Sequence, residues 1–372
     1  ITAETELTAA MEHGKDERFI THTRQPLNGG PPLDQLRASY LTPTEQFFAR
    51  NHSPIPEIDP QTFHLAIDGW VKRPLLLSLA DWQRDYPTRE LTATLQCAGN
   101  RRDEMLNAAQ MGSAVPWGSE AISNDRWQGA RLADILAAAA PRPEAAHLIA
   151  LSLDDCSADS GAEDEKGFGG SIPLAKALAP ETLLAYGMNG APLPPLHGGP
   201  LRLLAPGYIG ARSVKWLGRL TLAASPSQNH YQARSYRVFP PETNAQNVMW
   251  DEGESLGPLW VNAVICQPAA GENVSASPLR VAGYAQSSLP IAAVEISADG
   301  GQSWQTASLT GPADPWAWRF WEATLTLPPG EHELCVRAHD EQGNTQPADM
   351  PPTWNFKGYR IHHWQRRRIV VR

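Results

Sequence analysis

The feature that most constrains the fold is a change of pattern near residue 245. Before it, segments that alternate apolar and polar residues are interspersed with short helical segments. After it, almost every segment is a short alternating stretch, and turn signals separate these stretches at intervals of about 8–12 residues, as in an immunoglobulin-like β-sandwich. The sequence therefore predicts an α+β domain over residues 1–245, followed by a β-sandwich over residues 246–372.

The first domain has recognisable elements after a lead-in, residues 1–58, that is expected to be irregular. Residues 63–67 alternate between apolar and polar side chains, which predicts a half-buried strand. Ser78, with Asp81 three residues later, is typical of a helix start. Further strands are expected at 89–96, 147–153, 201–205 and 214–223, and helices at 131–140 and 173–179.

The second domain is expected to begin after a polar linker, residues 240–258. Cys266 and Cys335 flank Trp304 in an immunoglobulin-like order, so a disulfide between them is one alternative. The place of Cys266 on the first strand of the domain favours free thiols instead. Strands are expected at 260–266, 279–285, 292–297, 304–309, 321–327 and 333–339.

Composition excludes several classes of protein. The chain has 31 Lys and Arg against 40 Asp and Glu, so its formal net charge is −9, which argues against a nucleic-acid partner. No apolar run approaches the roughly 20 residues needed to cross a bilayer, so no membrane association is expected. The first residue is Ile rather than Met, which is expected of a mature protein after removal of a signal peptide, although an arbitrary starting point would look the same.

The most reactive candidate side chain is Cys97. It stands at the end of an expected strand and precedes a turn that contains Gly99, Arg101 and Arg102. A thiolate is the form of cysteine that binds metals, and neighbouring cations stabilise it. A buried cysteine can equally serve as a small apolar side chain, so the residues alone leave both interpretations open.

Arginine and histidine recur beside glycine or asparagine. Guanidinium groups in such sets suit a phosphate or another oxyanion, although each could also be a solvated surface charge. The sets are Arg50-Asn-His52, His197-Gly-Gly199 with Arg202, and Arg212-Ser-Val-Lys215. The chain lacks Cys-x-x-Cys, His-Glu-x-x-His, Walker and Gly-x-Gly-x-x-Gly motifs. Zinc, c-type haem and dinucleotide sites of familiar types are therefore not expected.

The stretch Thr94-Leu-Gln-Cys-Ala-Gly-Asn-Arg-Arg-Asp-Glu-Met105 resembles the cofactor-binding signature of the sulfite oxidase family of molybdopterin enzymes. The bacterial periplasmic haem-free sulfite dehydrogenases are the closest in kind. The resemblance continues over nearly the whole chain, in Phe47-Phe-Ala-Arg-Asn-His-Ser-Pro-Ile-Pro56, Trp127-Gln-Gly-Ala-Arg-Leu132, Gly170-Ser-Ile-Pro-Leu174, Gly210-Ala-Arg-Ser-Val-Lys-Trp-Leu-Gly218 and Trp316-Ala-Trp-Arg319.

The resemblance implies a fold and a set of site residues. The fold is a molybdopterin domain followed by an immunoglobulin-like dimerisation domain. Cys97 would be the thiolate ligand of molybdenum in a single molybdopterin cofactor, since a soft sulfur donor suits this metal. The residues implied to bind the cofactor are Arg50, His52, Cys97, Asp154, Ser171, His197, Arg202, Arg212, Ser213 and Lys215. Those implied to form the sulfite pocket are Arg50, Arg102, Trp117, Tyr236 and Arg366, the last contributed by the β-domain.

The activity implied by the resemblance is oxidation of sulfite to sulfate by oxygen-atom transfer from an oxo-molybdenum centre. The chain contains no region like the cytochrome-b-type domain of the animal enzymes, so we expect no haem. Electrons would pass one at a time to an external acceptor such as a c-type cytochrome. A homodimer formed through the β-domain and a periplasmic location are further expectations.

Two other functions compete with this one. A nitrate reductase of the same family would run the oxygen transfer in reverse, and Arg366 argues against it, because nitrate-reducing relatives have an uncharged residue there. A non-catalytic anion-binding or assembly protein would keep the pocket without the metal. Molybdenum analysis separates this last alternative from the two enzymes.

Overall fold

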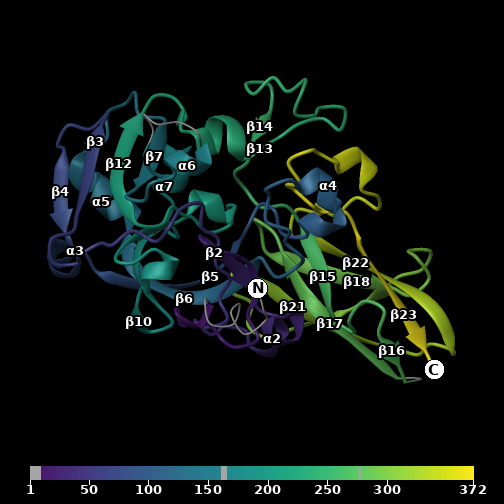
Figure 1. Cartoon of the computed structure of the whole chain (residues 1–372). Helices are drawn as coiled ribbons and strands as arrows, with labels where there is room; N and C mark the ends of the chain where they lie inside the picture. The colour runs from purple at the N-terminus through teal and green to yellow at the C-terminus, as the bar shows by residue number, and fades with distance from the viewer. Residues whose placement is uncertain (1–9, 161–165, 276–277) are drawn as a thin grey trace.

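The computed structural model describes residues 10–160, 166–275 and 278–372, and it shows two sheet-rich domains side by side (Figure 1). None of the helices in these ranges has the length and apolar character needed to cross a membrane. The α+β domain followed by a β-sandwich is confirmed.

Two five-stranded sheets form the first domain. The strand order is β10-β9-β6-β5 in one sheet, with β11 paired to β9, and β4-β3-β12-β7-β8 in the other. The strands are β3 (His64–Gly69), β4 (Leu75–Ser78), β5 (Thr88–Gln96), β6 (Ile122–Arg131), β7 (His147–Ser152), β8 (Gly169–Pro173), β9 (Leu183–Met188), β10 (Ala191–Pro192), β11 (Arg202–Leu204) and β12 (Leu217–Ala223). Apolar residues of both sheets and of α5 (Leu132–Ala139) form one core.

Local sequence explains the longer helices. In α3 (Leu79–Asp85), Ser78 and Asp81 make the expected reciprocal capping bonds, which satisfy backbone N–H groups of the first turn. The α5 helix ends at Ala139, and the next residue, Ala140, has a left-handed backbone directly before Pro141. The expected helix at 173–179 is shorter in the structure, α7 (Leu174–Ala177).

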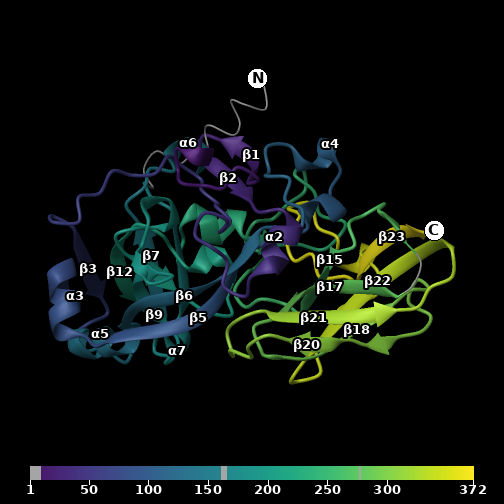
Figure 2. The same ribbon diagram turned by 90° about the horizontal axis from the view of Figure 1, so that it is seen from below.

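The lead-in is more regular than expected. It contains an antiparallel pair of strands, β1 (Ile20–Arg24) and β2 (Leu27–Gly30), and the short helix α2 (Leu33–Ala38). In Figure 2, α2 lies between the two domains, and its Leu36 is buried with Val264 and Phe320 of the second domain. The expectation of an irregular segment is therefore wrong for this part, because packing against other elements stabilises the short strands and helix.

The second domain is a sandwich of a four-stranded sheet, β15-β17-β21-β20, and a five-stranded sheet, β16-β23-β22-β18-β19. Its core takes residues from both sheets. The expected strand at 304–309 is split in two, and strands β16 and β23 were not expected. The strands are β15 (Asn262–Gln267), β16 (Asn273–Val274), β17 (Leu279–Gln286), β18 (Ile291–Ser297), β19 (Gln305–Thr306), β20 (Ser308–Thr310), β21 (Arg319–Leu325), β22 (Gly330–Asp340) and β23 (Gln365–Val371).

The cysteines of the sandwich are not paired. Cys266 lies on β15 in one sheet and Cys335 on β22 in the other, and both are free and buried. The alternative of a disulfide between them is therefore wrong, and the placement of Cys266 on the first long strand of the domain is confirmed.

A small two-stranded ladder forms around the expected linker. Strand β13 (Arg237–Val238) pairs with β14 (Glu254–Ser255), one on each side of the expected boundary at 245/246. The two domains also meet directly, since Thr94 N at the end of β5 donates to Trp316 O (3.0 Å). This junction lies close to the turn that contains Cys97.

Candidate active site

Cys97 follows directly on β5 and begins a tight turn. Its backbone N–H donates to Ala121 O (2.9 Å), and the side chain is only 6% exposed. Gly99 leaves room for Arg102 in this turn, since a Cβ atom there would lie 2.4 Å from a terminal nitrogen of Arg102. The Arg102 guanidinium thus lies against the backbone of the turn that follows Cys97.

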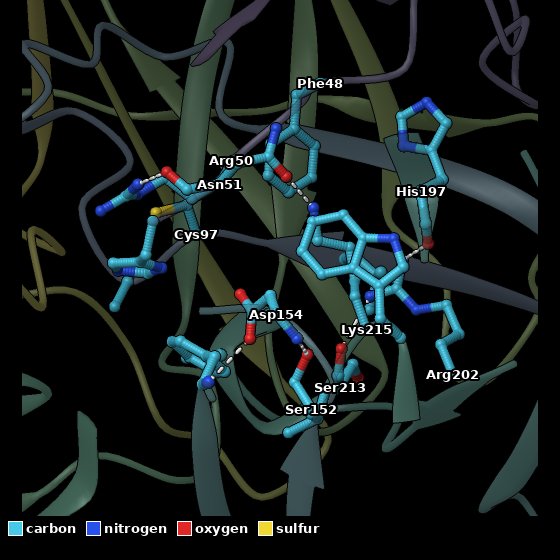
Figure 3. Close-up of a pocket in the computed structure, with 18 of the residues that line it drawn as sticks. Phe48, Arg50, Asn51, Cys97, Ser152, Asp154, His197, Arg202, Ser213 and Lys215 are labelled. Carbon is cyan, nitrogen blue, oxygen red and sulfur yellow. Dashed lines mark hydrogen bonds between the residues drawn. The ribbon is translucent and has the colours of Figure 1, made fainter. Parts of the chain in front are cut away.

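The Cys97 thiol lines a cavity in the first domain. Figure 3 shows side chains from several separate segments converging on this cavity. Nine of the expected site residues are among those that line it: Arg50, His52, Cys97, Asp154, His197, Arg202, Ser213, Lys215 and Tyr236. The structure therefore brings together residues that are far apart in the sequence.

Basic side chains outnumber acidic ones among the described residues that line this cavity. Burial, reinforced by the nearby Arg202 and Arg50, holds the pKa of Lys215 well below its usual range. Burial also lowers the pKa of Arg202 to about 9. Asp154 is the sole acid among the described lining residues. Buried cations without enough counter-charge favour an anionic ligand.

The carboxylate of Asp154 is already engaged within the protein. It accepts hydrogen bonds from Ser53 Oγ (2.7 Å) and Phe168 N (2.8 Å), and the Cys156 thiol donates to it as well (3.2 Å). Asp154 therefore shapes the wall of the cavity and does not neutralise its cations by direct pairing.

The cation cluster fits the phosphate of a molybdopterin. Two Arg202 nitrogens donate to His197 O and Ser213 O (2.8 Å each), whereas its buried Nε has no partner among the described residues. Lys215 donates to Asn51 Oδ1 and to Leu196 O. A phosphate oxygen would supply the missing acceptor and the missing negative charge. With a thiol on the same cavity wall, the residues present suit the cofactor that the sequence implies.

Tyr236 and His52 form a second polar group in the cavity. The Tyr236 hydroxyl and His52 Nε2 are 3.1 Å apart and share a hydrogen bond. Burial raises the pKa of Tyr236 well above its usual range, so the phenol keeps its proton. Burial, together with Arg50, holds the pKa of His52 well below its usual range, so the ring is neutral. This pair can therefore offer hydrogen-bond donors without carrying charge.

Arg102 is not among the residues that line the cavity, and it approaches Tyr236 only through Tyr359. Its guanidinium donates to Val115 O (2.7 Å) and Gly358 O (3.0 Å), and it lies 5.1 Å from the ring centre of Tyr359. Tyr359 in turn stacks on Tyr236 with ring centres 5.3 Å apart. The second domain thus reaches the pocket through the segment that contains Gly358 and Tyr359.

Arg366 is not part of this site. It lies on β23, and its guanidinium pairs with Glu333 on the neighbouring strand (3.0 Å) and donates to Gly300 O (3.2 Å). Its side chain is 34% exposed. The expectation that Arg366 joins the sulfite pocket is wrong for this structure. Arg366 therefore no longer argues against nitrate reduction.

Three other expected residues lie behind the cavity wall. Ser171 Oγ accepts from Ser227 N (3.0 Å) and bonds to Gln232, so its hydroxyl is used within the protein. Arg212 is buried, and its Nε donates to Leu256 O (3.0 Å). Neither belongs to the residues that line the cavity. The structure therefore places both outside the cavity lining, and their expected contact with the cofactor stays a prediction.

Trp117 is the third of these residues. It is fully buried in a hydrophobic cluster, with edge contacts to His22 (5.0 Å) and Phe48 (6.4 Å) between ring centres. It therefore supports the wall near Arg102 and does not line the cavity described above.

Sequence reasoning missed three residues at the site. Asn51 stands between two expected residues, and its side-chain oxygen accepts a hydrogen bond from the Lys215 amino group. Lys15 donates to Phe47 O (2.7 Å) and lies 2.9 Å from His197 Nε2, and burial lowers its pKa to about 7. Tyr359 comes from the other domain. Only Asn51 has a local signal, its place between Arg50 and His52.

Comparisons with known proteins match the chain from one end to the other. An oxidoreductase molybdopterin binding domain matches residues 52–231, and a Mo-co oxidoreductase dimerisation domain matches residues 255–372. Human mitochondrial sulfite oxidase is 39% identical over 385 residues, covering 100% of this chain and 69% of its own length. Barley nitrate reductase is 34% identical, covering 94% of this chain and 41% of its own length.

A solved structure has the same fold. The sulfane dehydrogenase SoxCD of Paracoccus pantotrophus superposes with a TM-score of 0.78 at 27% identity, over 93% of this chain and 85% of that one. Both domain matches and the identity to human sulfite oxidase agree with the site geometry. The chain belongs to the sulfite oxidase family of molybdopterin oxidoreductases.

Proposed function

We propose that this protein is a molybdenum-dependent sulfite dehydrogenase, which converts sulfite and water into sulfate, two protons and two electrons. The observation that carries the proposal is the Cys97 thiol in a buried, cation-lined cavity next to Tyr236 and Arg50. When bound, the molybdopterin cofactor supplies the oxygen-atom transfer and takes up the two electrons.

The chain's own residues divide the cavity between two tasks. Cys97 would supply the thiolate that holds the metal. Lys215 and Arg202 would bind the phosphate end of the pterin, because both line the cavity and the Nε of Arg202 lacks an acceptor among the described residues. Ser213 and His197 line the same wall and would complete the polar contacts of the cofactor.

Sulfite would bind between the arginines and Tyr236. The guanidinium groups of Arg50 and Arg102 can make charge-assisted hydrogen bonds to oxyanions. If His52 carries its proton on Nε2, the ring donates to the Tyr236 oxygen and leaves the phenol hydrogen free for a substrate oxygen. A donor held in this way stabilises negative charge that develops on the reacting anion.

The acceptor, the oligomer and the compartment complete the proposal. Electrons pass singly to a c-type cytochrome, the protein acts in the periplasm, and two chains associate through the β-sandwich. The match of residues 255–372 to a dimerisation domain supports the homodimer. The resemblance of the motifs to bacterial haem-free sulfite dehydrogenases supports the acceptor and the location.

Nitrate reduction is the second candidate, and the identity to barley nitrate reductase supports it. The higher identity to human sulfite oxidase favours sulfite. Comparing sulfite oxidation with nitrate reduction on one preparation separates the two, because a pocket built for one anion gives it the higher kcat/KM.

The deciding experiment uses full-length protein from a host that makes molybdopterin. We expect about one molybdenum per chain, and sulfite-dependent reduction of a c-type cytochrome, with ferricyanide as the control acceptor. The Cys97→Ser variant should fold and lose sulfite turnover, because the hydroxyl is a poorer ligand than the thiolate. A wild-type protein with bound molybdenum but no sulfite oxidation would refute the proposal, and an active Cys97→Ser variant would refute the ligand role.

A further inference from the structure

The turn that follows Cys97 is bonded to both domains. Within the first domain, Cys97 N donates to Ala121 O and Arg101 N donates to Gly118 O (2.6 Å). Three more hydrogen bonds join the turn to the second domain: Arg360 N to Ala98 O (3.2 Å), Asn100 Nδ2 to the Tyr284 hydroxyl (3.0 Å) and Arg102 Nε to Gly358 O (3.0 Å).

The Arg101 side chain adds further hydrogen bonds between the turn and the second domain. Its side chain is fully buried and makes a bidentate pair with Glu104, at 3.0 Å and 2.6 Å. Its remaining terminal nitrogen donates to Asn262 Oδ1 (2.7 Å) on β15 and to His363 O (3.0 Å). One guanidinium therefore ties the Cys97 turn to two separate segments of the second domain.

Glu104 is itself held by the second domain. Gln365 Nε2 donates to its Oε1 (2.8 Å), and His363 Nε2 lies 3.6 Å from its Oε2. Although burial opposes ionisation, Arg101 and these hydrogen bonds hold the pKa of Glu104 well below its usual range. The carboxylate thus stays charged, and the ion pair persists across the working pH range.

The backbone of Arg101 needs this support. Its φ of +69° lies in the left-handed region, which is unfavourable for a residue with a long side chain. Such a conformation persists only where surrounding contacts determine it. Two of the four side-chain hydrogen bonds of Arg101 described above, those to Asn262 and His363, come from the second domain, so docking of that domain stabilises the conformation of the turn.

We propose that Arg101, Glu104, Asn262, His363 and Gln365 form a domain clasp that positions the Cys97 turn, and with it the thiol and the Arg102 guanidinium. The β-sandwich then has a role in the active site besides dimerisation. The residues of the clasp are positioning residues, because none of them lines the cavity. The relevance of the clasp to catalysis rests on the proposed function, whereas its effect on the turn does not.

The test uses full-length protein from a host that cannot make molybdopterin, so that Cys97 is free to react. Iodoacetamide labels the cysteines, and peptide mass spectrometry follows each labelling rate separately. Arg101→Met should speed labelling of Cys97 by at least about tenfold, because only deprotonated and accessible thiols react. Cys266 and Cys335, buried in the sandwich, report unfolding of the second domain and should react at the wild-type rate.

A matched pair of variants in the second domain refines the test. Asn262→Ala removes the acceptor for Arg101 and should also speed Cys97 labelling several-fold. Asn262→Asp keeps an acceptor oxygen, and since Asn262 Nδ2 has no partner among the described residues, it should restore the wild-type rate. Arg337→Met, which breaks the Glu295 ion pair inside the sandwich, is the control and should leave Cys97 unchanged.

Two outcomes would overturn the domain clasp. One is an unchanged Cys97 rate in both Arg101→Met and Asn262→Ala. The other is equal acceleration of all the mapped cysteines, which would show general unfolding in place of local release. Should Arg101→Met fail to fold, the comparison of Asn262→Ala with Asn262→Asp decides alone. Because the assay needs neither cofactor nor substrate, its failure is distinct from failure of the proposed function.

Discussion

Asp125 is a buried carboxylate at the centre of β6, and its replacement by asparagine should make the protein less sensitive to pH. The residue is fully buried, and neither oxygen has a hydrogen-bond partner among the described residues. Burial raises its pKa to about 8, although the nearby backbone N–H groups of Arg126 and Asn189 offset part of the effect. In the unfolded chain the same carboxyl has its ordinary pKa of 3.8.

The sign of the effect follows from proton binding. Between pH 4 and pH 8 the folded protein holds a proton on Asp125 that the unfolded chain has released. Stability from this group is therefore complete below about pH 4 and falls as the pH rises towards 8. One bound proton corresponds to a slope of about 1.4 kcal/mol per pH unit, so the wild type loses about 3 kcal/mol between pH 5 and pH 7 through this residue.

Asp125→Asn removes that slope, since the amide does not titrate. Urea unfolding of the cofactor-free full chain at pH 5 and pH 7, followed by tryptophan fluorescence, measures the free energy of unfolding of both proteins. We expect the advantage of the variant over the wild type to grow by about 3 kcal/mol between these pH values. Asp349→Asn, at a carboxylate with 74% side-chain exposure, is the control and should show no such growth. A difference in the free energy of unfolding between the variant and the wild type that is equal at pH 5 and pH 7 would refute the reasoning.

Two further predictions concern the pocket. Tyr236→Phe should lower kcat for sulfite on the order of 100-fold with little change in KM, because it removes one hydrogen-bond donor to the reacting anion. Steady-state kinetics with ferricyanide as the acceptor measure both constants. A wild-type kcat would show that the hydroxyl takes no part in the reaction. Arg366→Met should leave the KM for sulfite within about twofold of the wild type, because its guanidinium pairs with Glu333 outside the cavity; a large rise in KM would return Arg366 to the pocket.

Much of the first domain could be predicted from local pattern. The strand that ends at Gln96, the helix capped by Ser78 and the strand at His147–Ser152 all follow from periodicity and capping. Strand β6 was not predicted as such, although it is the longest in this domain. It is buried along most of its length, so its sequence lacks a clean alternation of apolar and polar residues.

The site residues divide in a similar way. Nine expected residues line one cavity, and the sequence motifs identified them correctly. The cations that match the motif do not all point the same way, however. Arg212 and Ser213 are neighbours, yet Ser213 lines the cavity whereas Arg212 donates to Leu256 O behind it. Side-chain direction at such a turn depends on which acceptors the rest of the fold supplies.

The sequence by itself determined the family, the two-domain order and the position of Cys97 at the end of a strand, since these depend on local patterns and motifs. Only the tertiary structure decided which residues of the β-domain reach the site. On β23, Gln365 is buried against Glu104 and Ser119, whereas the adjacent Arg366 points to the other face and pairs with Glu333. Neighbouring residues of a strand face opposite sides, so the register of β23 against β22 places Arg366 outside the pocket, and local sequence does not specify that register.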